Sequence, residues 1–110
     1  MPLAILAILL FGIVCMVLLR VAADGKPHSV TLTWTPPPPR PDSVVAGYNV
    51  YRCCQPDGTF GAIASGVVTP TWVDRNVIPG TTYRYFVTTV DKAGRQSRPS
   101  EQVTATVPQP

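Results

Sequence analysis

The chain has 110 residues, which is enough for one domain and little else. Nine Lys and Arg residues against six Asp and Glu give a net charge of +3, too weak and too dispersed to indicate a nucleic-acid partner. With one histidine and three cysteines in the chain, a zinc site of the usual Cys/His kind is hard to build. The sequence holds no nucleophile motif and no phosphate-binding glycine loop, so we expect neither an enzyme nor a cofactor.

A long apolar run opens the chain. The residues from Leu3 to Leu19 carry no charge, and as a helix they would span about 25 Å, close to the ~30 Å hydrocarbon core of a bilayer. The run predicts a hydrophobic helix within residues 1–23 that meets the membrane through residues 3–23, followed by a short linker at 24–27. Two interpretations are open: a retained membrane anchor, and a secretion signal cleaved near Ala23.

From residue 28 onward the pattern changes to short alternating segments with turn residues between them. Strand patterns occupy six segments in chain order: 28–35, 48–53, 60–64, 71–73, 81–90 and 102–107. A proline run at 36–41 separates the first two segments, and a proline-containing tail at 108–110 ends the last. Frequent turns and the lack of an amphipathic helix predict an antiparallel β-sandwich over residues 28–107.

Alternation within these strands divides the large side chains into two sets. The inward set, which we expect to form the hydrophobic core, consists of Trp34, Tyr48, Val50, Trp72, Tyr83, Tyr85 and Val87. Tyr51 and Phe86 face outward. We interpret them as a pair across neighbouring strands and not as a binding platform.

Four motifs follow one another in an order that resembles one known family. They are the segment 28–34 ending in Trp34, the segment 47–52 around Tyr48, the run 78–87 with Pro79-Gly80-Thr81 before Tyr83, and the segment 94–100 with Ser97 and Ser100. Together they are similar to the fibronectin type III domain over about residues 28–107. The resemblance implies an all-β, antiparallel sandwich, here with a hydrophobic helix before it. It also implies that Tyr83 forms a tyrosine corner, its hydroxyl bonding back to the backbone.

The sequence departs from that family at two places. Only residues 22–27 separate the apolar run from the first predicted strand. We therefore expect the family's first strand to be short or missing, which would leave a sheet edge open to another chain. The second departure is the neighbouring pair Cys53 and Cys54, which stands where polar residues would be usual.

The cysteine pair allows several interpretations. In a trans chain the two Cα atoms lie about 3.8 Å apart, below the usual disulfide range of about 4.4–6.8 Å, so a bond between Cys53 and Cys54 would be strained. One packed and one exposed thiol, an intermolecular disulfide and a redox-sensitive pair all remain open.

The fold and composition together predict a non-catalytic module. We expect a membrane-tethered or exported protein whose sandwich lies outside the cytoplasm and binds an unidentified protein or cell-surface partner. The alternative is a subunit of an extracellular filament, a homo-oligomer that assembles through the hydrophobic helix or the open sheet edge. Neither a metal nor a nucleic acid is expected among its partners, and the fold alone does not choose between these roles.

Overall fold

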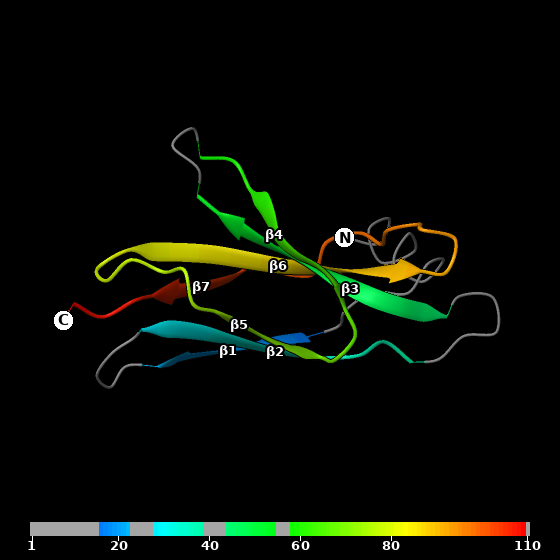
Figure 1. Cartoon of the computed structure of the whole chain (residues 1–110), viewed down its shortest axis with the longest axis horizontal. Helices are drawn as coiled ribbons and strands as arrows, with labels where there is room; N and C mark the ends of the chain where they lie inside the picture. The colour runs from blue at the N-terminus through cyan, green and yellow to red at the C-terminus, as the bar shows by residue number, and fades with distance from the viewer. Residues whose placement is uncertain (1–15, 23–27, 39–43, 55–57, 110) are drawn as a thin grey trace.

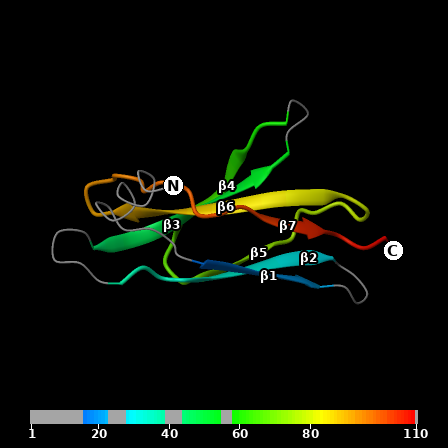
Figure 2. The ribbon, with the colours of Figure 1, turned by 180° about the vertical axis from the view of Figure 1, so that it is seen from behind.

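The computed structural model describes residues 16–22, 28–38, 44–54 and 58–109, and within these ranges the chain forms two facing β-sheets (Figure 1). The strands are β1 (Met16–Ala22), β2 (Ser29–Thr35), β3 (Val45–Cys53), β4 (Gly61–Val67), β5 (Thr71–Asp74), β6 (Thr82–Asp91) and β7 (Val103–Thr106). One sheet has the order β1-β2-β5 and the other the order β4-β3-β6-β7. All strand pairs are antiparallel, and the β3–β4 hairpin projects beyond the sandwich (Figures 1 and 2). The structure therefore confirms the predicted antiparallel sandwich.

The first strand is present, and it lies earlier in the chain than the sequence analysis predicts. β1 pairs with β2 along its whole length, from Met16 opposite Thr35 to Ala22 opposite Ser29. The expected helix is therefore wrong for its last residues, 16–22, and the sandwich begins at Met16 instead of residue 28. Over the seven residues of β1, apolar character does not distinguish the end of a helix from a buried strand. Without β1, the backbone N–H and C=O groups along one side of β2 would lack partners. Pairing with β1 satisfies these groups, which favours a strand over a helix for this segment.

The rest of the predicted hydrophobic helix, residues 1–15, lies outside the described residues, as do the expected linker at 24–27 and part of the proline run. Within the described ranges, no helix has the length and apolar character needed to cross a bilayer.

The hydrophobic core fills the space between the two sheets. Side chains alternate along β2, β3 and β6, and the inward set from each strand meets the set from the facing sheet. The fully or almost fully buried apolar residues are Val30, Leu32, Trp34, Tyr48, Val50, Cys53, Tyr83, Tyr85, Val87, Ala105 and Val107. This packing fixes the strands and leaves the outer face of the β4-β3-β6-β7 sheet free to carry other side chains.

Two serines extend the pairing of β6 beyond the reach of β7. β7 pairs only with residues 82–85 of β6. Farther along, the backbone N–H of Thr89 donates to Ser97 Oγ at 2.9 Å, and the N–H of Val87 donates to Ser100 Oγ at 2.9 Å. The serine backbones return the contact, with each N–H donating to the same strand. These hydrogen bonds hold residues 96–100 alongside β6. Gln96 is thereby placed on the outer face of the sheet.

Candidate functional site

The expected core residues occupy the interior with one exception. Trp34, Tyr48, Val50, Tyr83, Tyr85 and Val87 are buried, and the Trp34 and Tyr48 rings meet edge to face with centroids 5.2 Å apart. Trp72 is only half-buried. It lies on β5, a four-residue edge strand, and packs against the rim of the core. Burial raises the pKa of Tyr48 above its usual value of 10.0.

Tyr83 occupies the position implied by the family resemblance. The backbone N–H of Ile78 donates to the Tyr83 hydroxyl oxygen at 3.0 Å, five residues upstream. The Thr81 N–H donates to the Ile78 carbonyl, and Gly80 has φ of +80° in the turn between them, a conformation that side chains with a Cβ rarely adopt. The tyrosine hydroxyl therefore holds the backbone of the turn that leads into β6.

An ionic cluster that the sequence analysis missed joins the two sheets. The buried carboxylate of Asp74 accepts from Arg52 Nη1 at 2.9 Å, from the Tyr85 hydroxyl at 2.8 Å and from the Asn76 N–H at 3.1 Å. Burial, and then the hydrogen bond to Asp74, raise the pKa of Tyr85 well above its usual value of 10.0. The sequence pattern could have indicated this cluster, because the alternation along β3 places Arg52 inward, and a buried cation needs an acidic partner.

The ionic cluster lies beside a hollow of about 350 Å³ between the β4 and β5 edges of the two sheets. Arg52 and Asp74 form one side of this hollow, and Ile63 and Trp72 supply apolar surface. Arg75 is exposed and contributes to the lining. The guanidinium of Arg52 also lies over the Tyr83 ring, 5.0 Å from its centroid, so the cation is held by packing as well as by charge. These contacts hold the Arg52 side chain at one side of the hollow.

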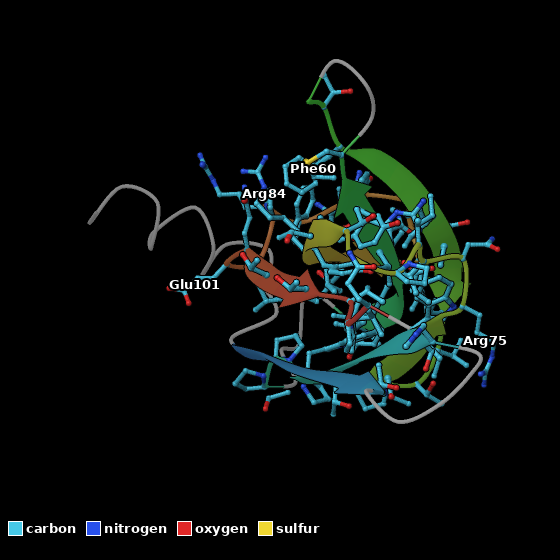
Figure 3. The ribbon with its side chains drawn as sticks, turned by 90° about the vertical axis from the view of Figure 1, so that its left-hand side faces the viewer. Phe60, Arg75, Arg84 and Glu101 are labelled. Carbon is cyan, nitrogen blue, oxygen red and sulfur yellow. A yellow bond between two sulfur atoms is a disulfide. The ribbon has the colours of Figure 1, made fainter. Side chains whose placement is uncertain are left out.

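Three half-buried rings form a row on the outer face of the four-stranded sheet, and we call Tyr51, Phe60 and Phe86 the aromatic row. Tyr51 lies directly opposite Phe86 across β3 and β6, which confirms the cross-strand pair, and their rings stack with centroids 4.6 Å apart. Phe60 packs on Phe86 at 5.0 Å. The guanidinium of Arg84 lies over the Phe60 ring at 5.4 Å, and Figure 3 shows these two side chains together.

A polar group borders the aromatic row. The exposed side chain of Gln96 presents Oε1 to three donors: the Tyr51 hydroxyl at 2.5 Å, the Thr88 hydroxyl at 2.6 Å and Asn49 Nδ2 at 3.3 Å. Because these donors occupy the oxygen, the amide nitrogen of Gln96 keeps its own donors available at the edge of the row. The outer face thus combines apolar ring surface with amide and guanidinium donors, a combination typical of binding surfaces.

The two neighbouring cysteines lie at the end of the same face. Cys53 ends β3 and is completely buried, whereas Cys54 is exposed. In the structure their Sγ atoms form a disulfide, and the peptide bond between them is cis, so the trans spacing assumed from the sequence does not apply. Arg84 Nη2 lies 3.2 Å from Cys53 Sγ and 3.5 Å from Cys54 Sγ. The structure therefore brings the cysteine pair, Arg84 and the aromatic row together.

Within the part of the chain that the structure describes, no three His, Cys, Asp or Glu side chains are grouped so as to hold a metal ion. The polar groups of the outer face can donate and accept hydrogen bonds, and the Cys53–Cys54 disulfide can undergo exchange with thiols.

Two facing antiparallel sheets, a buried tryptophan on the second strand and a tyrosine corner define the class of immunoglobulin-like sandwiches. Within that class, the model of the fibronectin type III domain matches residues 18–106, and the chain belongs to this family. The match begins inside β1, in agreement with the structure.

Known relatives and a solved structure agree with this assignment. The chain is 38% identical over 85 residues to an amylopullulanase of Thermoanaerobacter thermohydrosulfuricus, with 77% of this chain and 5% of that protein covered. It is 33% identical over 81 residues to an amylopullulanase of Thermoanaerobacterium saccharolyticum, with 74% of this chain and 6% of that protein covered. A crystal structure of an Fn3-like protein from Clostridium thermocellum superimposes with a TM-score of 0.69 at 24% identity, covering 90% of this chain and 95% of that one. The chain thus spans about one-twentieth of the curated relatives it matches.

Proposed function

We propose that this protein is a non-catalytic, exported or membrane-tethered module that displays its fibronectin type III domain for interaction with a protein or a surface. The contact surface in this proposal is the aromatic row with the amide of Gln96 and the guanidinium of Arg84 beside it. The observation that carries the proposal is that three half-buried rings gather on the outer face of a sheet whose core is already complete.

The relatives support a modular role. The segment shared with the amylopullulanases is a small part of each enzyme, and it corresponds to one folded domain of this chain. A domain of this kind contributes surface and spacing to a larger protein. Because those relatives are named for their action on pullulan, a polysaccharide is the first surface to test.

Binding of pullulan can be measured by affinity electrophoresis of the full chain in native gels that contain the polysaccharide. We expect retardation of the wild type and about two- to tenfold weaker binding for Phe60→Ala, because one aromatic contact is worth about 0.5–1.5 kcal/mol. Val68→Ala is the matched control, since Val68 is 77% exposed and lies beyond the end of β4, outside the aromatic row. Unretarded wild type, or equal weakening by both substitutions, would contradict a polysaccharide-binding role for the aromatic row.

Membrane attachment is the part of the proposal that the apolar run supports, through residues 3–15, which precede β1. Cell fractionation followed by intact-mass analysis tests it. Full-length chain that stays in the membrane after an alkaline wash supports a retained anchor, and an exported chain that starts near Asp24 supports a cleaved signal. Full-length chain in the cytosol would contradict both. Self-association remains a prediction, but of its two routes, the hydrophobic helix and an open sheet edge, the edge expected beside β2 is occupied by β1.

A further inference from the structure

The Cys53–Cys54 pair is a second chemical feature of the outer face, and it shares Arg84 with the aromatic row. We propose that this pair is a thiol–disulfide exchange site for small thiols, in which Cys54 is the sulfur attacked and Cys53 is the leaving sulfur. The assignment depends on the unequal exposure of the two cysteine residues and on the guanidinium beside their sulfurs.

Access decides which sulfur reacts first. Cys53 has no exposed surface, while Cys54 is exposed at the start of the loop that joins β3 to β4. An incoming thiolate approaches along the line of the sulfur–sulfur bond and needs open space at the sulfur it attacks. The arrangement therefore directs a small thiol to Cys54.

The charge beside Cys53 favours its departure. Arg84 Nη2 lies 3.2 Å from Cys53 Sγ, closer than to Cys54 Sγ at 3.5 Å. A guanidinium stabilises a thiolate, and a more stable thiolate leaves faster. Arg84 is held in place because it lies over the Phe60 ring and stands opposite Cys53 across β3 and β6. The leaving thiolate thus forms next to a fixed cation.

The exchange balances with two molecules of thiol. A thiolate RS⁻ attacks Cys54 Sγ, the Cys53–Cys54 bond breaks, and the electron pair goes to Cys53 as a thiolate beside Arg84. A second thiolate attacks the R sulfur of the mixed disulfide, which releases RSSR and the Cys54 thiolate. Both cysteines are then reduced, two RSH are oxidised to RSSR, and the two protons lost by the thiols can return to the cysteine sulfurs. Protonated Cys53 has the Gly58 carbonyl oxygen 3.8 Å away as an acceptor.

The experiment uses the full chain with Cys15→Ser, so that only the pair can exchange. Air-oxidised protein is mixed with reduced glutathione, quenched with iodoacetamide at intervals, and mapped by mass spectrometry. We expect the glutathione adduct on Cys54 and an exchange rate that falls about three- to tenfold in Arg84→Gln, because the leaving thiolate loses its cation. Arg75→Gln is the matched control, because Arg75 is exposed on a different side of the molecule from Arg84 (Figure 3). It should react at the wild-type rate.

Two single-cysteine variants make the test independent of Arg84. With Cys53→Ser, the remaining Cys54 should be alkylated at once in the folded protein. With Cys54→Ser, the buried Cys53 should react at least about tenfold more slowly, and tryptophan fluorescence confirms that each variant is folded. An adduct on Cys53, equal rates for Arg84→Gln and the wild type, two free thiols in the air-oxidised protein, or a doubled mass that collapses on reduction would each overturn the proposal.

Discussion

Replacement of Asp74 by alanine should destabilise the domain more than most single substitutions. The Asp74 side chain is 3% exposed and accepts hydrogen bonds from Arg52, Tyr85 and the Asn76 backbone. Alanine removes the carboxylate but leaves its donors in place. The Tyr85 hydroxyl, in a residue with no exposed surface, then has lost its acceptor, and the partly buried Arg52 has lost its counter-ion.

The size of the effect follows from these contacts. Removal of one partner of a buried ion pair costs about 3–5 kcal/mol. The lower end applies here, because the Arg52 side chain is 21% exposed and keeps the Asn76 carbonyl at 3.1 Å as an acceptor. Tyr85→Phe removes one hydrogen bond and should cost about 1–1.5 kcal/mol. In the Asp74→Ala background, Tyr85→Phe should cost nothing or restore about 1 kcal/mol, since it removes the orphaned hydroxyl.

Urea unfolding followed by tryptophan fluorescence measures all four members of this cycle. With a slope of about 1–1.5 kcal/mol per M for a domain of this size, a loss of about 3 kcal/mol lowers the midpoint by roughly 2–3 M. Glu101→Gln is the control, because Glu101 is exposed and its substitution should change stability by no more than about 0.5 kcal/mol (Figure 3). If Asp74→Ala behaves like the control, or if Tyr85→Phe costs the same in both backgrounds, the three groups do not act as one cluster.

Three further predictions concern pH and the loop before β7. Burial alone would raise the pKa of Asp91, but hydrogen bonds from Arg95 and the Ala93 N–H hold this pKa below its usual 3.8. The ionised Asp91 therefore stabilises the fold above that pH, and this stabilisation is lost as the pH falls further. Acid unfolding curves should therefore be less steep for Asp91→Asn than for the wild type, and identical curves would contradict this account. The pKa of Tyr85 is raised, so the wild type should lose stability as the pH rises above 10.0, and Tyr85→Phe should lack that part of the alkaline loss. Ser97→Ala and Ser100→Ala each leave a buried N–H of β6 without its acceptor and should cost about 1–3 kcal/mol in urea unfolding, whereas unchanged midpoints would show that water replaces the hydroxyls.

The sequence was sufficient for those parts of the fold that local pattern determines. The alternation around Trp34 and Tyr48 and the turn before Tyr83 each specify a backbone geometry over a few residues, and the structure has that geometry. β1 escaped prediction because an apolar run has the same pattern in a membrane helix and in a paired strand. Only the backbone pairing with β2, which is a property of the whole sheet, distinguishes the two.

The outer face was only partly predictable for a different reason. Tyr51 and Phe86 could be paired by alternation, but Gln96 reaches them from a segment that has no strand periodicity. Its position depends on Ser97 and Ser100, whose hydroxyls replace a missing strand along β6. Contacts of this kind join residues 45 positions apart and leave no local signal in the sequence.

The pairing of β1 with β2 has a consequence for how the domain meets other copies of itself. A protease cut after Ala23 would detach a seven-residue strand and leave the outer side of β2 with unpaired amides and carbonyls. Such a border accepts a strand from a neighbouring molecule. The segment from Met16 to Ala22 therefore covers this border of β2, and its removal would expose the border to other copies of the domain.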